Sequence, residues 1–321
     1  MRHGRQGAAR RGAQVRARCQ GSEGREEVAR ALPLLRREEP APVPSYDSSR
    51  VRFRLADRHI AVFAHLLDGE TPPEELWESL VELQRIGLVG EEGELAPVLR
   101  EPLGALADPM VMIQVEITGE HGVVNHGVIV GQEAVISHDG WPGEEESEYV
   151  SIEPNTLVWE LARKVNLHRT EKTEEDAPGI RVETTMGALD AAFVALEEPG
   201  PDDDVTRDLV RKTLIDADTT LKDPALGQFL DLVVSLNATW RITTAWDGEH
   251  EGKRSTMVRA LAVWDCGPLG YWIREQPEEP IMPGQVGPDS ALVLVKSDSA
   301  EVWEKITDLL PDKEELLTAG E

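Results

Sequence analysis

The sequence predicts an α+β fold in which a mainly antiparallel sheet unit occurs twice, each copy closing with a helix, with further helices flanking the two copies. The first observation is a repeat: residues 110–167 and 238–310 each contain four strand-like runs followed by one helix-like run. The second is helical periodicity at 57–86, before the first copy, and at 184–237, between the copies. We expect a single domain over residues 49–313, which is large but within the usual size range.

Residues 1–48 precede this domain and have a different composition. Residues 1–50 contain 11 Arg and 6 acidic residues, and Pro40, Pro42 and Pro44 follow as an extended linker that cannot continue a helix. The pair Arg10–Arg11 is not followed by the apolar stretch that an export signal needs. We therefore predict that 1–48 is a disordered Arg-rich leader with a Pro linker.

Two helices are expected at 57–86. In the first, Ile60, Phe63 and Leu67 have helical spacing. The second is predicted to begin at a capping box formed by Thr71 and Glu74, and to end at a glycine.

The repeated units carry the fold prediction. The first has strands at 110–118, 123–131, 133–140 and 149–152 and a helix at 155–167; the second has strands at 238–246, 256–265, 270–275 and 291–296 and a helix at 299–310. When the two closing helices are aligned, Trp159 matches Trp303. Asp298 and Glu301 together predict a cap at the start of the second closing helix. A tryptophan at the same place in both copies favours a core position over a ligand pocket.

Three helices are predicted between the copies, at 184–196, 204–218 and 224–237. The last has a wider apolar face than a half-exposed helix needs, so this face is either fully buried or partly offered to a partner. Its residues are Leu226, Phe229, Leu230 and Val233.

Charge excludes several function classes. The chain has 33 Lys and Arg against 60 Asp and Glu, a net charge of −27, which disfavours nucleic acid and anionic membrane surfaces as partners. A winged helix-turn-helix regulator remains an alternative reading of 57–95, but its second helix is acidic. No apolar run is long enough to cross a bilayer.

No pattern of catalytic or metal-ligating residues is present. The eight histidines lack ligand spacing, the glycine-containing loop 248–254 lacks the phosphate-loop pattern, and Cys266 has no base near it in sequence. The sequence therefore predicts a protein that is not an enzyme and needs no cofactor or metal. An enzyme whose site is assembled only by the fold is a further alternative.

The order of these parts resembles the EspG family, cytosolic chaperones of type VII secretion. The stretches that carry the resemblance are LVELQRIGLV (81–90), APVLREPLGALADP (96–109), YVSIEP running into TLVWELARKVNL (149–167), IRVETTMGALDAAF (180–193), GYWIRE (270–275) and ALVLVK (291–296). The sequence departs from the family in its Arg-rich leader and in the insert 276–290. The resemblance implies a pseudo-twofold fold, a cytoplasmic location and binding of a PE–PPE pair through an apolar surface, with the sheet and a helical bundle meeting the partner.

Partner-binding residues follow from this resemblance as candidates. They are the hairpin residues Gly119, Glu120, His121 and Gly122, and the helix residues Leu226, Phe229, Leu230 and Val233, for which plain core packing is the alternative. Self-association is left open.

Overall fold

The computed structural model describes residues 44–120, 122–169, 180–197, 203–218, 220–275 and 286–317. Most of the predicted leader lies outside these residues. Its end does not: Ser45–Asp47, assigned to the linker from the sequence, form strand β1. β1 pairs with β2, and Tyr46 stacks on Phe53 with ring centroids 4.7 Å apart. The described fold thus begins before the predicted boundary at 49.

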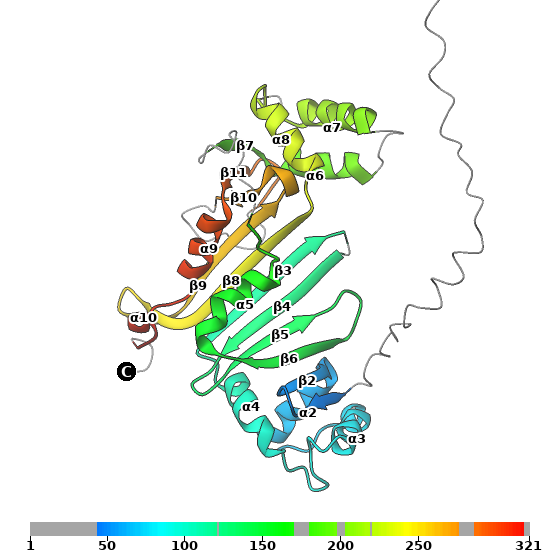
Figure 1. Cartoon of the computed structure of the whole chain (residues 1–321), viewed down its shortest axis with the longest axis vertical. Coiled ribbons are helices and arrows are strands. Elements are labelled where there is room, and N and C mark those ends of the chain that lie inside the picture. The colour runs from blue at the N-terminus through cyan, green and yellow to red at the C-terminus, as the bar shows by residue number, and fades with distance from the viewer. Residues whose placement is uncertain are drawn as a thin grey trace, which may run out of the picture. The chain divides into compact units, whose positions relative to one another are not determined.

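The described residues form an 11-stranded antiparallel sheet with helices on both faces, which confirms the α+β class (Figure 1). The strands are β1 (Ser45–Asp47), β2 (Arg52–Ala56), β3 (Val111–Gly119), β4 (Gly122–Val130), β5 (Val135–Gly140), β6 (Glu146–Ile152), β7 (Arg181–Thr185), β8 (Ala238–His250), β9 (Lys253–Asp265), β10 (Tyr271–Arg274) and β11 (Ala291–Ser297). The α-helices are α2 (Asp57–Leu67), α3 (Trp77–Arg85), α4 (Arg100–Ala107), α5 (Leu157–Lys164), α6 (Met186–Glu197), α7 (Asp203–Ala217), α8 (Ala225–Val234), α9 (Ser299–Asp308) and α10 (Lys313–Leu317).

The sheet order shows a pseudo-twofold arrangement. The strands run β1-β2-β6-β5-β4-β3-β8-β9-β10-β11-β7, so β3 and β8, the first strands of the two predicted copies, pair at the centre. Val115, the fifth residue of β3, pairs with Ile242, the fifth residue of β8, as a twofold axis between the strands requires. The duplication predicted from sequence is therefore present in the structure.

The repeat is longer than predicted. Each half starts with a strand that leads into three α-helices, continues with four strands and ends with a helix: β2 to α5 in the first half, β7 to α9 in the second. β2 pairs with β6 and β7 pairs with β11, the last strand of the same half in each case. The segments 57–86 and 184–237, predicted as separate flanking helices, are thus equivalent parts of the repeat.

One face of the sheet is covered by α5 and α9. Their buried residues join those of β3, β8 and β9 in one core cluster that includes Val115, Ile242, Leu161 and Ile306. The side chains of the strands alternate between the two faces, so each strand gives every second residue to this core.

Trp159 corrects the prediction of a core tryptophan. Its side chain is 69% exposed, and it meets Trp303 edge-to-face with ring centroids 4.5 Å apart. The aligned tryptophans therefore pack against each other where α5 and α9 meet, on the outer surface of both helices. Periodicity alone does not show this, because Trp159 and Val158 are adjacent and only one of them can face the sheet.

A buried ion-pair network attaches α5 to β5. The Lys164 side chain has no exposed surface, and its Nζ lies 2.5 Å from Asp139 Oδ1 and 3.0 Å from the carbonyl oxygen of His138. Although burial raises the pKa of Asp139, hydrogen bonds with His126 and Lys164 hold it far below its usual range. A hydrogen bond from Arg163 lowers the pKa of Glu160 to about 2. Both carboxylates are thus ionised at neutral pH and balance the buried ammonium.

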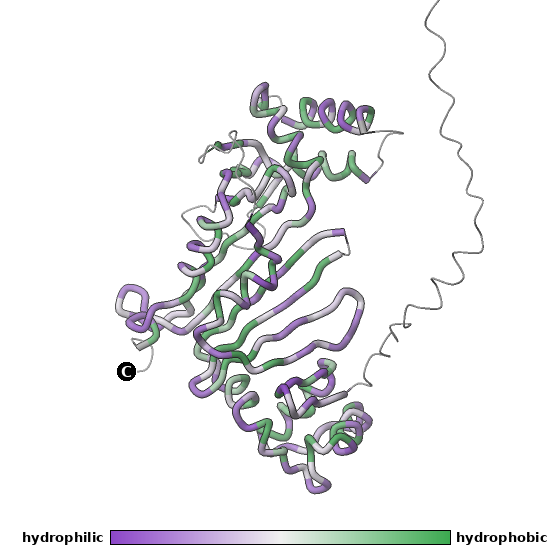
Figure 2. Tube along the Cα trace, viewed as in Figure 1, coloured by the Kyte–Doolittle hydropathy of each residue, from purple (hydrophilic) through white to green (hydrophobic). Residues whose placement is uncertain are grey.

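Over the part of the chain that the structure describes, helices cover the other face of the sheet only at its two ends. Helices α2, α3 and α4 pack at the β2 end, where their core includes Phe53, Phe63 and Leu83. Helices α6, α7 and α8 pack at the β7 end, where their core includes Val210 and Phe229. In Figure 2, polar and apolar residues recur along the whole length of α7, as expected for a helix with one buried side.

Two helix starts test the predicted caps. Asp298 and Glu301 form the predicted capping box on α9, where Asp298 Oδ1 accepts from the backbone amide of Glu301 at 2.9 Å. The box predicted at Thr71 is absent: residues Glu74–Leu76 form a 3-10 turn after Pro73, and α3 starts at Trp77 without a side-chain cap. The predicted end is confirmed by Gly87, whose φ of +76° suits glycine.

The buried side chain of His59 makes the folding stability depend on pH. It is fully buried in α2, its Nδ1 accepts from the Ala56 amide at 2.9 Å, and its Nε2 lies 2.9 Å from Glu82. Burial lowers the pKa of His59 in spite of Glu82. The unfolded chain therefore binds a proton that the folded protein excludes, so the stability that His59 contributes is full above its unfolded pKa of about 6.5 and is lost as the pH falls below it.

We expect the free energy of unfolding, measured in urea, to decrease as the pH falls from 7.5 to 5.5. In His59→Gln this decrease should be less steep, and the two slopes should differ by at most about 1.4 kcal/mol per pH unit, the value for one proton. His65→Gln, at a half-exposed site on the same helix, is the control. Identical pH slopes for His59→Gln and the wild type would contradict the assignment.

Candidate functional site

At its centre the sheet has one face that none of the described residues covers, and we call it the open face. It consists of the side chains of β3, β4, β8 and β9 that point away from α5 and α9. On β3 they alternate with the buried residues, and they are exposed: Met112, Gln114, Glu116 and Thr118. The register places Val123 of β4 opposite Thr118, and Val258 of β9 in the same row as Met112. Met112, Val123 and Val258 are each more than half exposed.

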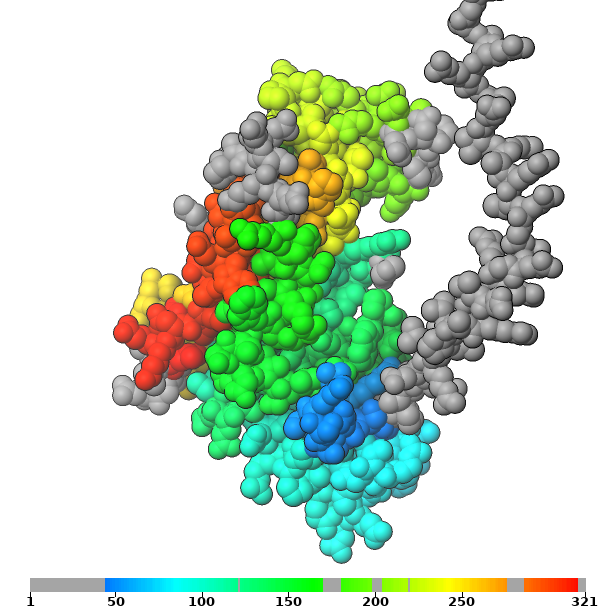
Figure 3. Space-filling model, in the orientation of Figure 1, coloured from blue at the N-terminus to red at the C-terminus, as the bar shows by residue number. Residues whose placement is uncertain are grey.

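The open face lies between the two helical groups. In Figure 3 the surface is hollowed between helices α6–α8 and strands β3 and β4. The helix α6 borders the open face with Phe193, whose side chain is 36% exposed. Apolar side chains are therefore presented both by the sheet and by the neighbouring helix, in a chain whose net charge is −27.

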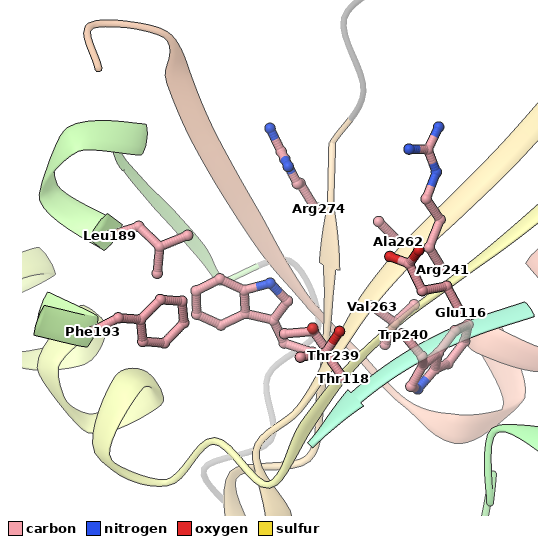
Figure 4. A pocket seen from close by; sticks show the side chains of 11 residues that line it. Glu116, Thr118, Leu189, Phe193, Thr239, Trp240, Arg241, Ala262, Val263 and Arg274 are labelled. Atoms are coloured by element: carbon pink, nitrogen blue, oxygen red, sulfur yellow. The ribbon is translucent and has the colours of Figure 1, made fainter. Parts of the chain in front are cut away.

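Where α6 meets the open face, a pocket of about 270 Å³ forms, which we call the α6 pocket (Figure 4). Leu189 and Phe193 of α6 form one side, and the other residues come from β3, β8, β9 and β10. They are Glu116, Thr118, Thr239, Trp240, Arg241, Ala262, Val263, Trp264 and Arg274.

Two arginines stand in one row across the pocket. Arg241 of β8 is opposite Ala262 of β9, and Ala262 is opposite Arg274 of β10. Both arginines rise from the same face of the sheet in Figure 4. Two strand spacings separate their backbones by roughly 10 Å, and the small side chain of Ala262 leaves the space between them open.

These arginines have no ion pair with any carboxylate among the residues that the structure describes. Glu116 is opposite Arg241 in the register but forms no ion pair with it. Arg274 donates from Nη2 to the sulfur of Met186 at 3.4 Å, a weak acceptor. Burial lowers the pKa of Arg274, and the charge of Arg241 lowers it further. The two cations thus repel each other, and an anion between them would relieve that repulsion.

The predicted hairpin candidates lie at the β3–β4 turn. Gly119 ends β3, Glu120 is exposed, and Gly122 starts β4 with a φ of +88° that glycine tolerates; His121 lies outside the described residues. This turn is an accessible corner of the sheet, on strands that also supply the open face.

The predicted helix candidates lie elsewhere. All four residues are at most 3% exposed and belong to the core between α8 and the sheet: Leu226, Phe229, Leu230 and Val233. Phe229, for example, contacts Trp264 with ring centroids 6.3 Å apart. This placement favours the packing alternative, and the open face does not include these four side chains.

Sequence reasoning missed Phe193, Arg241 and Arg274 as site residues. Phe193 lies in the helix predicted at 184–196, where the sequence does not show which residues face a neighbouring sheet, and nothing in the spacing of the two arginines relates them. The alternation of Met112, Gln114 and Glu116 on one face of their strand was the available signal, but it does not show whether another element covers that face.

Groups able to do chemistry are sparse in the described segments. Cys266 is buried, and burial raises the pKa of its thiol to about 12, so it is not an activated nucleophile. Over the same segments, no three His, Cys, Asp or Glu side chains gather as a metal site would require. None of the described helices has both the length and the hydropathy of a membrane span.

Comparisons with known proteins find similar folds among the solved structures. No protein-family model matches the sequence, and no curated protein does. Among solved structures, the chain is similar to the Mycobacterium tuberculosis type VII secretion system chaperone EspG5, solved in complex with a PE25–PPE41 dimer. The identity is 11% and the TM-score 0.46, over 81% of this chain and 97% of the other.

Proposed function

We propose that this protein is a non-enzymatic chaperone or adaptor of type VII secretion, which binds a PE–PPE pair through its open face and keeps the pair soluble. The observation that carries the proposal is the uncovered centre of the sheet. A sheet face normally packs against another layer, yet Met112, Val123 and Val258 are exposed here while both ends of the same face are covered.

The apolar open face suits a partner that must be shielded from water. Exposed apolar groups gathered at one place favour protein–protein contact. The chain's net charge of −27 opposes self-aggregation of such a surface. The residue resemblance to the EspG family gives the class of partner, a PE–PPE pair, and the EspG5 structure contains one such pair, PE25–PPE41.

Co-expression with PE–PPE pairs of the source organism, followed by size-exclusion chromatography, tests the proposal. We expect one pair to elute with the protein as a ternary complex and to stay bound in about 1 M salt, because apolar contacts are not screened as ion pairs are. The same pairs expressed alone should aggregate more. If no pair co-elutes at any salt concentration, the proposal is wrong.

A further inference from the structure

The α6 pocket combines two features that point to one kind of ligand. Leu189 and Phe193 give it an apolar side, and Arg241 and Arg274 give it two cations that form no ion pair with a carboxylate of the described residues. Elsewhere in the described chain, arginines generally have such partners: Arg52, Arg54, Arg58, Arg163, Arg181, Arg207, Arg211, Arg254 and Arg259 all form ion pairs with Asp or Glu.

The local charge of the pocket opposes that of the chain. Its lining contains two arginines and one acidic residue, Glu116, while the whole chain carries −27. A guanidinium binds a carboxylate through two parallel hydrogen bonds, and two guanidinium groups on either side of Ala262 can converge on the same carboxylate. The repulsion between Arg241 and Arg274 is a cost of the free protein that such a ligand removes.

Resting on the function proposed above, we propose that the α6 pocket binds a segment of the partner in which an acidic side chain lies beside a bulky apolar one. The carboxylate is held between Arg241 and Arg274 above Ala262, and the apolar side chain lies on Phe193. The open face supplies apolar area, and the arginine pair selects the partner and fixes its register.

Charge-removing variants test this with the co-purified PE–PPE pair. Arg241→Gln and Arg274→Gln should each raise the dissociation constant at least 10-fold, measured by isothermal titration calorimetry at about 0.15 M salt. Arg181→Gln is the matched control: it removes the same charge from β7, outside both the α6 pocket and the open face, where Arg181 pairs with Glu183 at 2.6 Å, and should change the constant less than twofold. Thermal unfolding of each variant checks the fold.

Rescue identifies the partner's acidic residue. Acidic residues of the partner are replaced by Lys one at a time, and one of these replacements should bind Arg241→Glu better than it binds the wild type. Binding by the two glutamine variants within twofold of the wild type would overturn the inference and leave the proposed function standing. An equal loss in Arg181→Gln would also overturn it, because the effect would then be one of net charge.

A small carboxylate tests ligand binding in the α6 pocket even if no PE–PPE pair binds. NMR of the arginine Nε–H groups is recorded during titration with 3-phenylpropionate, and with uncharged 3-phenylpropanol as the control. We expect saturable shifts of Arg241 and Arg274 with the carboxylate only, and no saturable shift of Arg181. Equal, non-saturating shifts of all three arginines would overturn the pocket, whatever the fate of the proposed function.

Discussion

The Asp139→Ala variant is expected to lose about 3 kcal/mol of unfolding free energy at pH 7, since breaking a buried ion pair from one side leaves an uncompensated charge. The charge left behind is that of Lys164, whose side chain has no exposed surface. Its remaining carboxylate, Glu160, lies 3.4 Å away and also binds Arg163 and Ser137. Urea unfolding monitored by tryptophan fluorescence measures the loss.

Two further variants separate the buried pair from surface electrostatics. Asp139→Ala combined with Lys164→Met removes both charges, and should recover more than half of the loss because no ammonium is then buried alone. Arg163→Ala breaks ion pairs of a side chain that is 57% exposed, so it should cost less than about 1 kcal/mol. Additive losses in the double variant would show that the pair is not coupled.

The sequence was informative where a pattern is local. The strands of both copies, the closing helices and the helices at 57–67 and 186–234 lie within a few residues of their predicted positions, because alternation and 3.6-residue spacing are properties of a short segment. Strands β2 and β7 were missed as parts of the repeat. Each has only five residues and runs directly into a helix, so the strand pattern is too short to stand out.

Surface features were harder to predict because they depend on distant segments. Alternation showed that β3 has two faces. The extent of the open face, however, is set by α4, which packs on β5, and by α6, which lies beside β8 and β9, and these two helices are far apart in sequence. A glycine in the sequence indicates a close approach only once the residue packed against it is known. A Cβ on Gly131 would lie 2.7 Å from the Cα of Ala105, so the glycine allows α4 to approach the sheet closely. The row of Arg241, Ala262 and Arg274 likewise exists only through strand register.

The second large effect is expected on partner binding, when the open face is made polar without a change of charge. Met112→Asn combined with Val258→Asn should weaken binding of the co-purified PE–PPE pair at least 30-fold, about 2 kcal/mol, because two apolar contacts are lost and two amides are buried without partners. Both side chains are more than half exposed in the free protein, so the free energy of unfolding should fall by only about 1 kcal/mol per substitution. Calorimetry measures the first quantity and urea unfolding the second.

The opposite side of the protein provides the control that makes this result specific. Trp159 is more exposed than either residue and contacts Trp303 on the outer surface of α5 and α9, so exposure of a large apolar side chain does not by itself identify the docking surface. Trp159→Asn should leave binding within twofold of the wild type, since the proposed docking surface is the other face of the sheet. If Trp159→Asn abolishes binding and the Met112 and Val258 variant does not, the partner binds over α5 and α9, and the open face is not its site.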